Sequence, residues 1–136
     1  MEQNGNIKHP LSRRFRGFLP VIVDVETGGF NAQTDALLEI AAVTVTYDVN
    51  HVLVPDKEIG YHTIPFEGAN IEQAAIEFNG IDPFHPLRPA IEESEALQKI
   101  FQVVRKAVKE HDCTRAILVG HNPAMDLAFL NAAVER

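Results

Sequence analysis

The sequence lacks several features that secreted, membrane-bound or strongly basic proteins have. Its 136 residues include no tryptophan and one cysteine, Cys113, so no disulfide can form within the chain. No apolar run approaches the roughly 20 residues that span a bilayer, and the opening MEQNGNIKHP has no apolar signal-peptide core. The formal net charge of −7 argues against broad, charge-driven binding to nucleic acid, although a local basic patch remains compatible with it. We therefore expect a cytoplasmic protein that does not insert into membranes.

The composition otherwise suits one folded domain. Hydrophobic residues make up 46% of the chain and charged residues 23%, and this length is enough to bury a core. We expect residues 1–11 to form a flexible N-terminal arm and residues 12–136 to form the domain. Cys113 is expected to be a small buried hydrophobe rather than a nucleophile.

The hydrophobic pattern predicts a mixed α/β sheet. An antiparallel meander of three strands comes first, and a helical crossover then leads to a parallel strand. Asn70 is expected to cap the first helix, and a proline-rich loop at 82–89 follows it. Strands are predicted at 19–27, 37–48, 58–66 (after a break at Pro55–Asp56) and 115–121, and helices at 70–81, 91–111 and 123–136.

The stretch VIVDVETGGF (21–30) places two carboxylates inside an apolar strand. Strand alternation puts Asp24 and Glu26 on one face, beside Ile22, while valines fill the other, so both faces look buried. Two anions so close in a dry environment need a raised pKa or a compensating cation, and no lysine or arginine occurs in the next ten residues. A divalent cation such as Mg²⁺ would suit them. The alternative is a frayed strand end whose carboxylates cap the following turn through water.

A third carboxylate, Asp126, follows the last predicted strand. Asn122 before Pro123 fits an N-cap with proline at the first helical position, which puts Asp126 in the first turn. Its position could simply complement the helix dipole. However, Phe129 and Leu130 lie three and four residues later, so Asp126 borders the apolar stripe and should face the sheet. Three carboxylates meeting at one point suit phosphodiester hydrolysis with paired Mg²⁺ or Mn²⁺ ions.

The ordered segments DVETGG (24–29), LLEIAAV (37–43), FNGI (78–81) and HNPAMDLAFL (121–130) resemble the first two motifs of the DEDD 3′–5′ exonucleases, of the histidine-using (DEDDh) branch. The resemblance implies a ribonuclease-H-like fold, two divalent ions (Mg²⁺, with Mn²⁺ as the other candidate), and removal of single nucleotides from RNA 3′ ends. It implies tRNA end turnover and stable RNA maturation in particular, with single-stranded DNA as a further substrate. Carried over residue by residue, Asp24, Glu26 and Asp126 are the catalytic, metal-binding carboxylates.

The family's third motif, H-x-A-x-x-D, has no match in these residues. His111 is followed by DCTRA, and His121 belongs to the second motif, where it is interpreted as a structural histidine at a strand end. The general-base histidine and the fourth carboxylate are therefore missing. We expect the exonuclease domain to be incomplete at its C-terminal end, and residues 1–136 alone to be inactive.

Arginines and aromatic residues are the predicted substrate contacts. The stretch SRRFRGF (12–18) could be a solvated arm, but arginine also binds phosphates and stacks on bases. The resemblance implies a homodimer in which such a basic patch serves the partner's active site. Phenylalanines near the catalytic strand are candidates for base stacking, with ordinary core packing as the alternative. The predicted nucleic-acid contacts are Arg14, Arg16, Arg115, Phe30, Phe78 and Met125.

Two other functions stay open on the sequence. A phosphatase of the haloacid dehalogenase type has a D-x-D-x-T loop that DVETG resembles, although the second acid here is Glu26 rather than aspartate. A non-catalytic nucleic-acid-binding module is the other alternative, because the third motif is absent from these residues.

Overall fold

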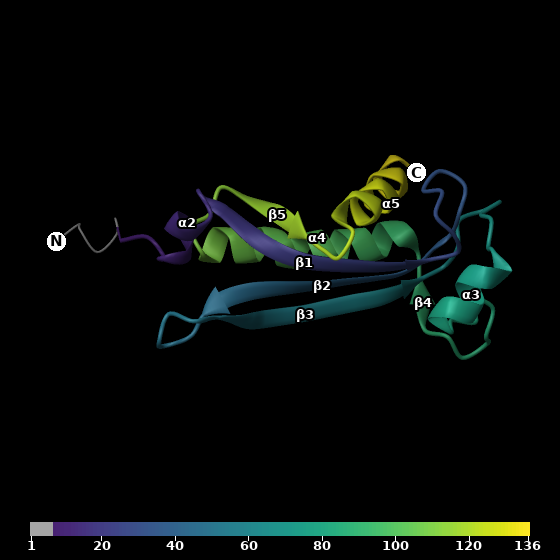
Figure 1. Cartoon of the computed structure of the whole chain (residues 1–136), viewed down its shortest axis with the longest axis horizontal. Coiled ribbons are helices and arrows are strands. Elements are labelled where there is room, and N and C mark those ends of the chain that lie inside the picture. The colour runs from purple at the N-terminus through teal and green to yellow at the C-terminus, as the bar shows by residue number, and fades with distance from the viewer. Residues whose placement is uncertain (1–6) are drawn as a thin grey trace.

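The structure is a computed structural model that describes residues 7–136, so most of the predicted arm lies outside the described residues. Figure 1 shows the arrangement of the helices and strands. In chain order these are α2 (Leu11–Arg14), β1 (Phe18–Thr27), β2 (Leu37–Tyr47), β3 (Leu53–Thr63), α3 (Gln73–Asn79), β4 (Ala90–Ile91), α4 (Glu93–Glu110), β5 (Arg115–Val119) and α5 (Pro123–Glu135).

The strands form one five-stranded sheet in the order β4-β3-β2-β1-β5. β1, β2 and β3 pair antiparallel, whereas β5 lies parallel to β1 and is reached through α4. This confirms the predicted meander and crossover. β4, which pairs with β3 over two residues, was not predicted because two residues carry no periodic signal.

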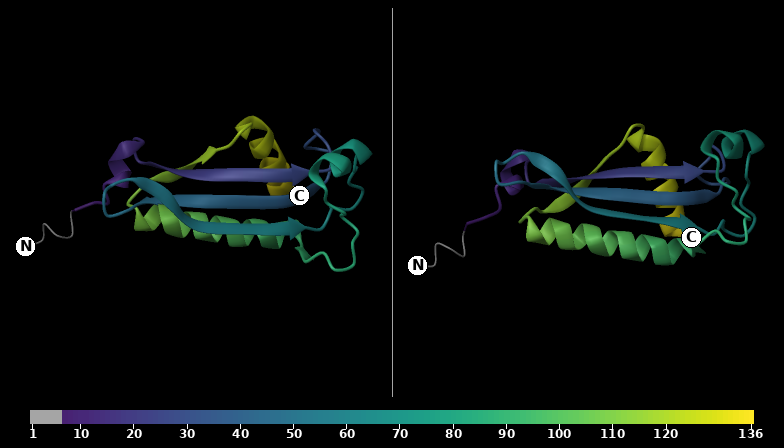
Figure 2. Two further views of the ribbon diagram at one scale, coloured as in Figure 1. Left: turned by 60° about the horizontal axis from the view of Figure 1, so that its bottom comes forward. Right: turned by 90° about the horizontal axis from the view of Figure 1, so that it is seen from below.

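One face of the sheet is covered by helices. α4 runs along the strands, and α5 crosses them toward the N-terminal end of α4 (Figure 2). Val21, Val23 and Val25 of β1 form a single apolar cluster with Ile100 of α4 and Phe129 of α5. The acidic residues in the first turn of α4 and Lys109 in its last turn complement the helix dipole.

The opposite face of β1 is not buried, so the prediction that both faces are buried is wrong for the described residues. Ile22, Ile117 and Val119 are 38%, 47% and 44% exposed. The reason is that α4 and α5 both pack against the valine face. Asp24 shares the open face and is itself exposed.

Three local predictions also need correction. β3 begins at Leu53, before the predicted break, and runs through Pro55. Pro55 pairs with Val45 of β2. β4 pairs with β3 only at His62 and Thr63, so the proline nitrogen lies at a part of β3 where no bond to β4 is needed. α3 is shorter than predicted and begins after Glu72, whose backbone carbonyl accepts the Ala75 N–H, whereas Asn70 pairs with Asp35. Leu11 is not loose but fully buried at the start of α2.

Cys113 is half-buried rather than buried, and burial raises the pKa of its thiol. That shift does not suit a nucleophile. None of the helices within residues 7–136 has the length and apolar character that a bilayer crossing requires.

Candidate active site

The end of β1 carries the first two carboxylates. Asp24 lies opposite Ala41 of β2 and Glu26 opposite Glu39, and the register shifts directly after Glu26. Their side chains leave the strand on the same side, as strand alternation requires. Glu39 adds a third negative charge next to Glu26 on the neighbouring strand.

The start of α5 carries the third carboxylate. The carbonyl of Asn122 accepts the N–H groups of Met125 (3.0 Å) and Asp126 (3.3 Å), so Asn122 begins the helix through its backbone, with Pro123 in the first turn. Asp126 is 7% exposed, and its Oδ1 accepts the backbone N–H of Val25 at 3.2 Å. The side chain therefore faces β1, as the sequence predicted.

Gly120 leaves the space that Asp126 occupies. A Cβ atom at position 120 would lie 2.8 Å from Asp126 Oδ2 and 3.1 Å from the Val23 carbonyl oxygen. Any other residue there would have to displace the carboxylate or the strand. The glycine between β5 and α5 thus lets the third carboxylate approach β1.

Crowding of these acids changes their protonation. Burial raises the pKa of Glu26, and the charges of Asp24, Glu39 and Asp126 together with a hydrogen bond to Asp24 raise it further. Burial also raises the pKa of Asp126, with the Asp24 charge acting in the same direction and the Val25 N–H opposing it. A nearby cation would stabilise the ionised form of both acids and lower their pKa values.

The expected convergence into a preformed metal site is not observed. In the described part of the chain, no group of three or more histidine, cysteine, aspartate or glutamate side chains is arranged to hold an ion. The three carboxylates nevertheless line the same cavity.

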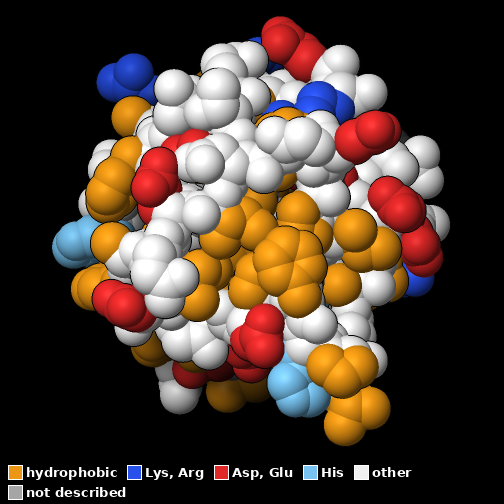
Figure 3. All heavy atoms as spheres, turned by 90° about the vertical axis from the view of Figure 1, so that its right-hand side faces the viewer, with side chains coloured by type: hydrophobic (Ala, Val, Ile, Leu, Met, Phe, Trp, Pro, Cys, Tyr) orange, Lys and Arg blue, Asp and Glu red, His pale blue; other side chains and the backbone are white. Residues whose placement is uncertain are grey.

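This cavity of about 830 Å³ lies between the end of β1, α3 and the start of α5. Its apolar wall includes Phe30 and Phe78, which are 90% and 93% exposed. At this end of the molecule, apolar side chains gather at the centre and acidic ones lie around them (Figure 3). The two phenylalanines are therefore not core residues, whereas Met125 both lines the cavity and packs against the core.

Several cavity residues were not identified from the sequence as contributing to the site. Asp35 and Glu72 reach the cavity from loops, and Asn122 lines it at the N-terminus of α5. His121, interpreted from the sequence as a structural histidine at a strand end, is exposed and also lines the cavity. One signal could have placed it, because residues that follow two adjacent parallel strands emerge at the same edge of the sheet.

The predicted basic patch lies away from this cavity. Arg14, Arg16 and Arg115 are exposed, and Arg115 pairs with Phe18 at the start of β1. The six residue-to-residue steps from Phe18 to Asp24 correspond to about 20 Å of strand. Arg14 lies over the rings of Phe15 and Tyr47. The structure therefore does not bring these arginines to the carboxylates of the same chain.

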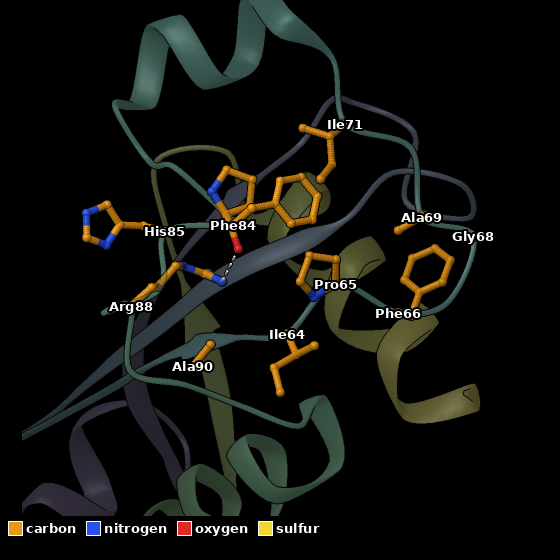
Figure 4. Close-up of a pocket in the computed structure, with 11 residues that line it drawn as sticks. Ile64, Pro65, Phe66, Gly68, Ala69, Ile71, Phe84, His85, Arg88 and Ala90 are labelled. Carbon is orange, nitrogen blue, oxygen red and sulfur yellow. Dashed lines mark hydrogen bonds between the residues drawn. The ribbon is translucent and has the colours of Figure 1, made fainter.

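A second cavity of about 510 Å³ is formed by residues 64–90 and has different chemistry. Phe66, Phe84 and Ile71 are among the residues that line it, and the Arg88 guanidinium donates to the Pro83 carbonyl (Figure 4) and to the Leu38 carbonyl. No carboxylate lines it. The carboxylate cavity is therefore the candidate active site.

Comparison with known proteins identifies the family of this chain. The model of the exonuclease family matches residues 21–136, and the chain belongs to this family. Its relatives include ribonuclease T of Hahella chejuensis, 56% identical over 135 residues, which are 99% of this chain and 62% of the relative. Ribonuclease T of Vibrio campbellii is 61% identical over 127 residues, 93% of this chain and 59% of the relative. The chain thus spans about three fifths of the curated relatives it matches.

Solved structures show the same fold at low sequence identity. Escherichia coli exonuclease I in complex with a dT13 oligonucleotide has a TM-score of 0.67 and 15% identity, covering 87% of this chain and 24% of that one. The zinc-bound form of its complex with single-stranded DNA has a TM-score of 0.66, 16% identity and coverages of 87% and 23%. The fold is ribonuclease-H-like, and the family match favours the nuclease interpretation over the phosphatase.

Proposed function

We propose that the protein containing this chain is a metal-dependent 3′–5′ exonuclease of the cytoplasm that trims RNA 3′ ends, tRNA above all, and also accepts single-stranded DNA. One observation carries the proposal: Asp24, Glu26 and Asp126, a hundred residues apart, line one cavity together with exposed aromatic rings. The name ribonuclease T of its relatives supports RNA as substrate. The oligonucleotide complexes of its structural neighbours support a single-stranded substrate.

The donor set suits a hard divalent cation. Asp24, Glu26 and Asp126 offer carboxylate oxygens, the ligands that Mg²⁺ and Mn²⁺ prefer. Their crowding raises the pKa of Glu26 and of Asp126, and a cation would offset that repulsion. When bound, such ions activate water and stabilise the charge that develops on the leaving oxygen. We therefore assign Asp24, Glu26 and Asp126 as the metal ligands.

The chain's own residues would bind and orient the 3′ end. Phe30 and Phe78 present almost fully exposed rings at the cavity, and every base has a face that can stack on such a ring. Met125 supplies a further apolar contact beside Asp126. The Val25 N–H fixes the Asp126 carboxylate with respect to β1. Stacking without base-edge recognition would hold different terminal bases in the same place.

The basic patch fits a dimer better than a single chain. Arg14, Arg16 and Arg115 lie at the opposite end of β1 from the carboxylates, so they would not reach the phosphates of a nucleotide bound in their own chain. In a homodimer they would bind RNA that enters the partner's cavity. We therefore propose that the active assembly is a homodimer.

Replacing Asp24 with asparagine tests the proposal. In the intact protein, Asp24→Asn should abolish trimming of a 3′-labelled RNA in Mg²⁺ while leaving RNA affinity within about twofold, because the aromatic rings and the basic patch remain. Asp56→Asn, an exposed change on β3, is the matched control and should trim normally. Substantial turnover by Asp24→Asn would contradict the metal assignment.

A further inference from the structure

Phe30 is one of two almost fully exposed aromatic residues at the cavity. Its ring is 90% exposed, so almost no side-chain packing fixes where it lies. Its position is therefore set by the backbone on either side, at Gly29 and Asn31. The loop that contains it must be held rigidly if the ring is to receive a base at a constant distance from the carboxylates.

Asp35 contacts both neighbours of Phe30. Its Oδ2 accepts the backbone N–H of Asn31 at 2.9 Å. The same oxygen lies so close to Gly29 that a Cβ atom there would come within 2.1 Å of it, so only glycine fits. Asp35 is 5% exposed, and its hydrogen bonds lower the pKa of its carboxyl although burial opposes this, so it is ionised at neutral pH.

Asp35 also joins this loop to the segment that leads into α3. Its Oδ1 accepts Asn70 Nδ2 at 2.9 Å, and the backbone bonds Asn70 N–H to Thr34 oxygen (2.8 Å) and Ala36 N–H to Asn70 oxygen (2.9 Å) flank that contact. The Glu72 N–H then donates to the Gly28 carbonyl (2.6 Å) just before α3 begins. α3 has no buried residue, so these bonds, rather than core packing, place it.

Phe78 lies on that helix. Asn79, next to it, donates from Nδ2 to the Thr27 carbonyl of β1 at 3.1 Å. Both exposed rings are therefore tied to the end of β1, Phe30 through Asp35 directly and Phe78 through the Asp35–Asn70 pair and Asn79.

We propose that Asp35 is a positioning residue that holds Phe30, and through Asn70 the helix carrying Phe78, at the distance from Asp24, Glu26 and Asp126 that nucleotide binding requires. This inference rests on the proposed function. Asp35 lines the cavity, but its oxygens accept hydrogen bonds from Asn31 and Asn70, so its effect would pass through the two aromatic rings.

Stacking of the terminal base is the direct readout. In intact protein carrying Asp24→Asn to prevent turnover, a short RNA with 2-aminopurine at its 3′ end should lose fluorescence when its base stacks on Phe30. Adding Asp35→Asn should weaken binding about five- to tenfold and reduce this quenching, because a stacking contact is partly lost. Affinity for Mn²⁺, measured in protein that retains Asp24, should not change with Asp35→Asn.

Three comparisons separate positioning from general instability. Asp48→Asn is the matched control, since Asp48 Oδ1 likewise accepts the N–H groups of Asn50 (2.8 Å) and Val52 (3.0 Å), but in the distant β2–β3 hairpin; it should bind RNA normally. With Phe30→Ala already present, Asp35→Asn should weaken binding less than it does alone, because only its effect on Phe78 then remains. If Asp35→Asn does not fold, Asn70→Ala removes one of the partners of Asp35 and should give a smaller loss of the same kind.

The outcomes distinguish this inference from the function beneath it. Weaker binding by Phe30→Ala combined with normal binding by Asp35→Asn and Asn70→Ala would overturn the role of Asp35 and leave the nuclease proposal standing. Equal losses from Asp35→Asn with and without Phe30→Ala would also overturn it. Unchanged binding by Phe30→Ala would overturn both this role and the stacking on which it depends.

Discussion

At the scale of single residues, the active site is defined by acids that repel one another. Burial and the nearby charge of Asp24 raise the pKa of Glu26 and of Asp126, so in the absence of a cation these groups oppose folding once they ionise. The sheet and α5 hold them together because Val21, Val23, Phe129 and their neighbours pack well on the other side of β1. Function and stability therefore conflict at the end of this strand.

Glu26→Gln should test this conflict, because it removes the charge of Glu26. A carboxyl whose pKa is raised on folding reduces stability above that raised value and not below its ordinary pKa, near pH 4. Without metal, Glu26→Gln should therefore raise the free energy of unfolding by about 0.5–1 kcal/mol at pH 7.5 and leave it unchanged at pH 4. Urea melts at the two pH values measure this difference.

The same variant should respond weakly to metal. Mg²⁺ should stabilise the unsubstituted protein by about 2–3 kcal/mol at a hundred times its dissociation constant, and less at pH 5, where protons compete for the raised carboxylates. Glu26→Gln should lose most of this gain. A full Mg²⁺ response in Glu26→Gln would show that Glu26 is not a ligand.

At the scale of elements, α5 connects the core to the site. Phe129 is fully buried against the sheet, one helical turn after Asp126, so the same packing that fixes the helix also directs Asp126 at the Val25 N–H. Phe129→Ala should lower the free energy of unfolding by about 3–5 kcal/mol, because it leaves a cavity in the core. Leu127→Ala, at a position 46% exposed on the same helix, should cost much less. Comparable thermal melts for the two variants would contradict this role of Phe129.

The arginine patch gives a second test at this scale. Replacing Arg14 and Arg16 with alanine should weaken RNA binding and reduce its dependence on salt, because binding with fewer phosphate contacts releases fewer counterions. Mixing this variant with Asp24→Asn should restore part of the activity through mixed dimers, in which one cavity is intact and faces an intact patch. An unchanged salt dependence would favour the alternative interpretation, that residues 12–18 are a solvated arm.

Sequence reasoning predicted the elements that have strong periodicity and missed those fixed by tertiary contacts. The apolar residues of α4 recur at helical spacing, so this helix could be predicted. The start of α5 could be predicted because proline occupies its first turn. Asn70 has the composition of an N-cap, but Asp35 competes for it, and that contact spans 35 residues. Likewise no local pattern in the sequence shows that α4 and α5 pack on the same face and leave Ile22 open.

At the scale of the whole molecule, we expect the chain to provide only part of what hydrolysis requires. Three carboxylates and two exposed rings share the cavity, and no H-x-A-x-x-D occurs in these 136 residues. His111 cannot replace the missing base, because its Nδ1 contacts the Ala107 carbonyl (2.7 Å) and its Nε2 contacts Thr46 (2.8 Å), so both ring nitrogens are engaged in the core. His121 is the histidine that lines the cavity, which makes it the one to test.

We expect residues 1–136 alone to trim RNA very slowly, since water activation generally needs a base within hydrogen-bond reach and the second ion needs further ligands. The exposed apolar residues Ile22, Ile117 and Val119 beside Asp24 should also favour self-association. Extending the chain with the downstream residues of the Vibrio campbellii ribonuclease T, only 59% of which this chain covers, should restore Mg²⁺-dependent trimming and a defined oligomer. Trimming rates of a short RNA and light scattering measure the two effects, with Asp24→Asn in the extended chain as the inactive control. Equal trimming by the two chains would mean that a histidine within the 136 residues is the base, and loss of that activity in His121→Ala would identify it.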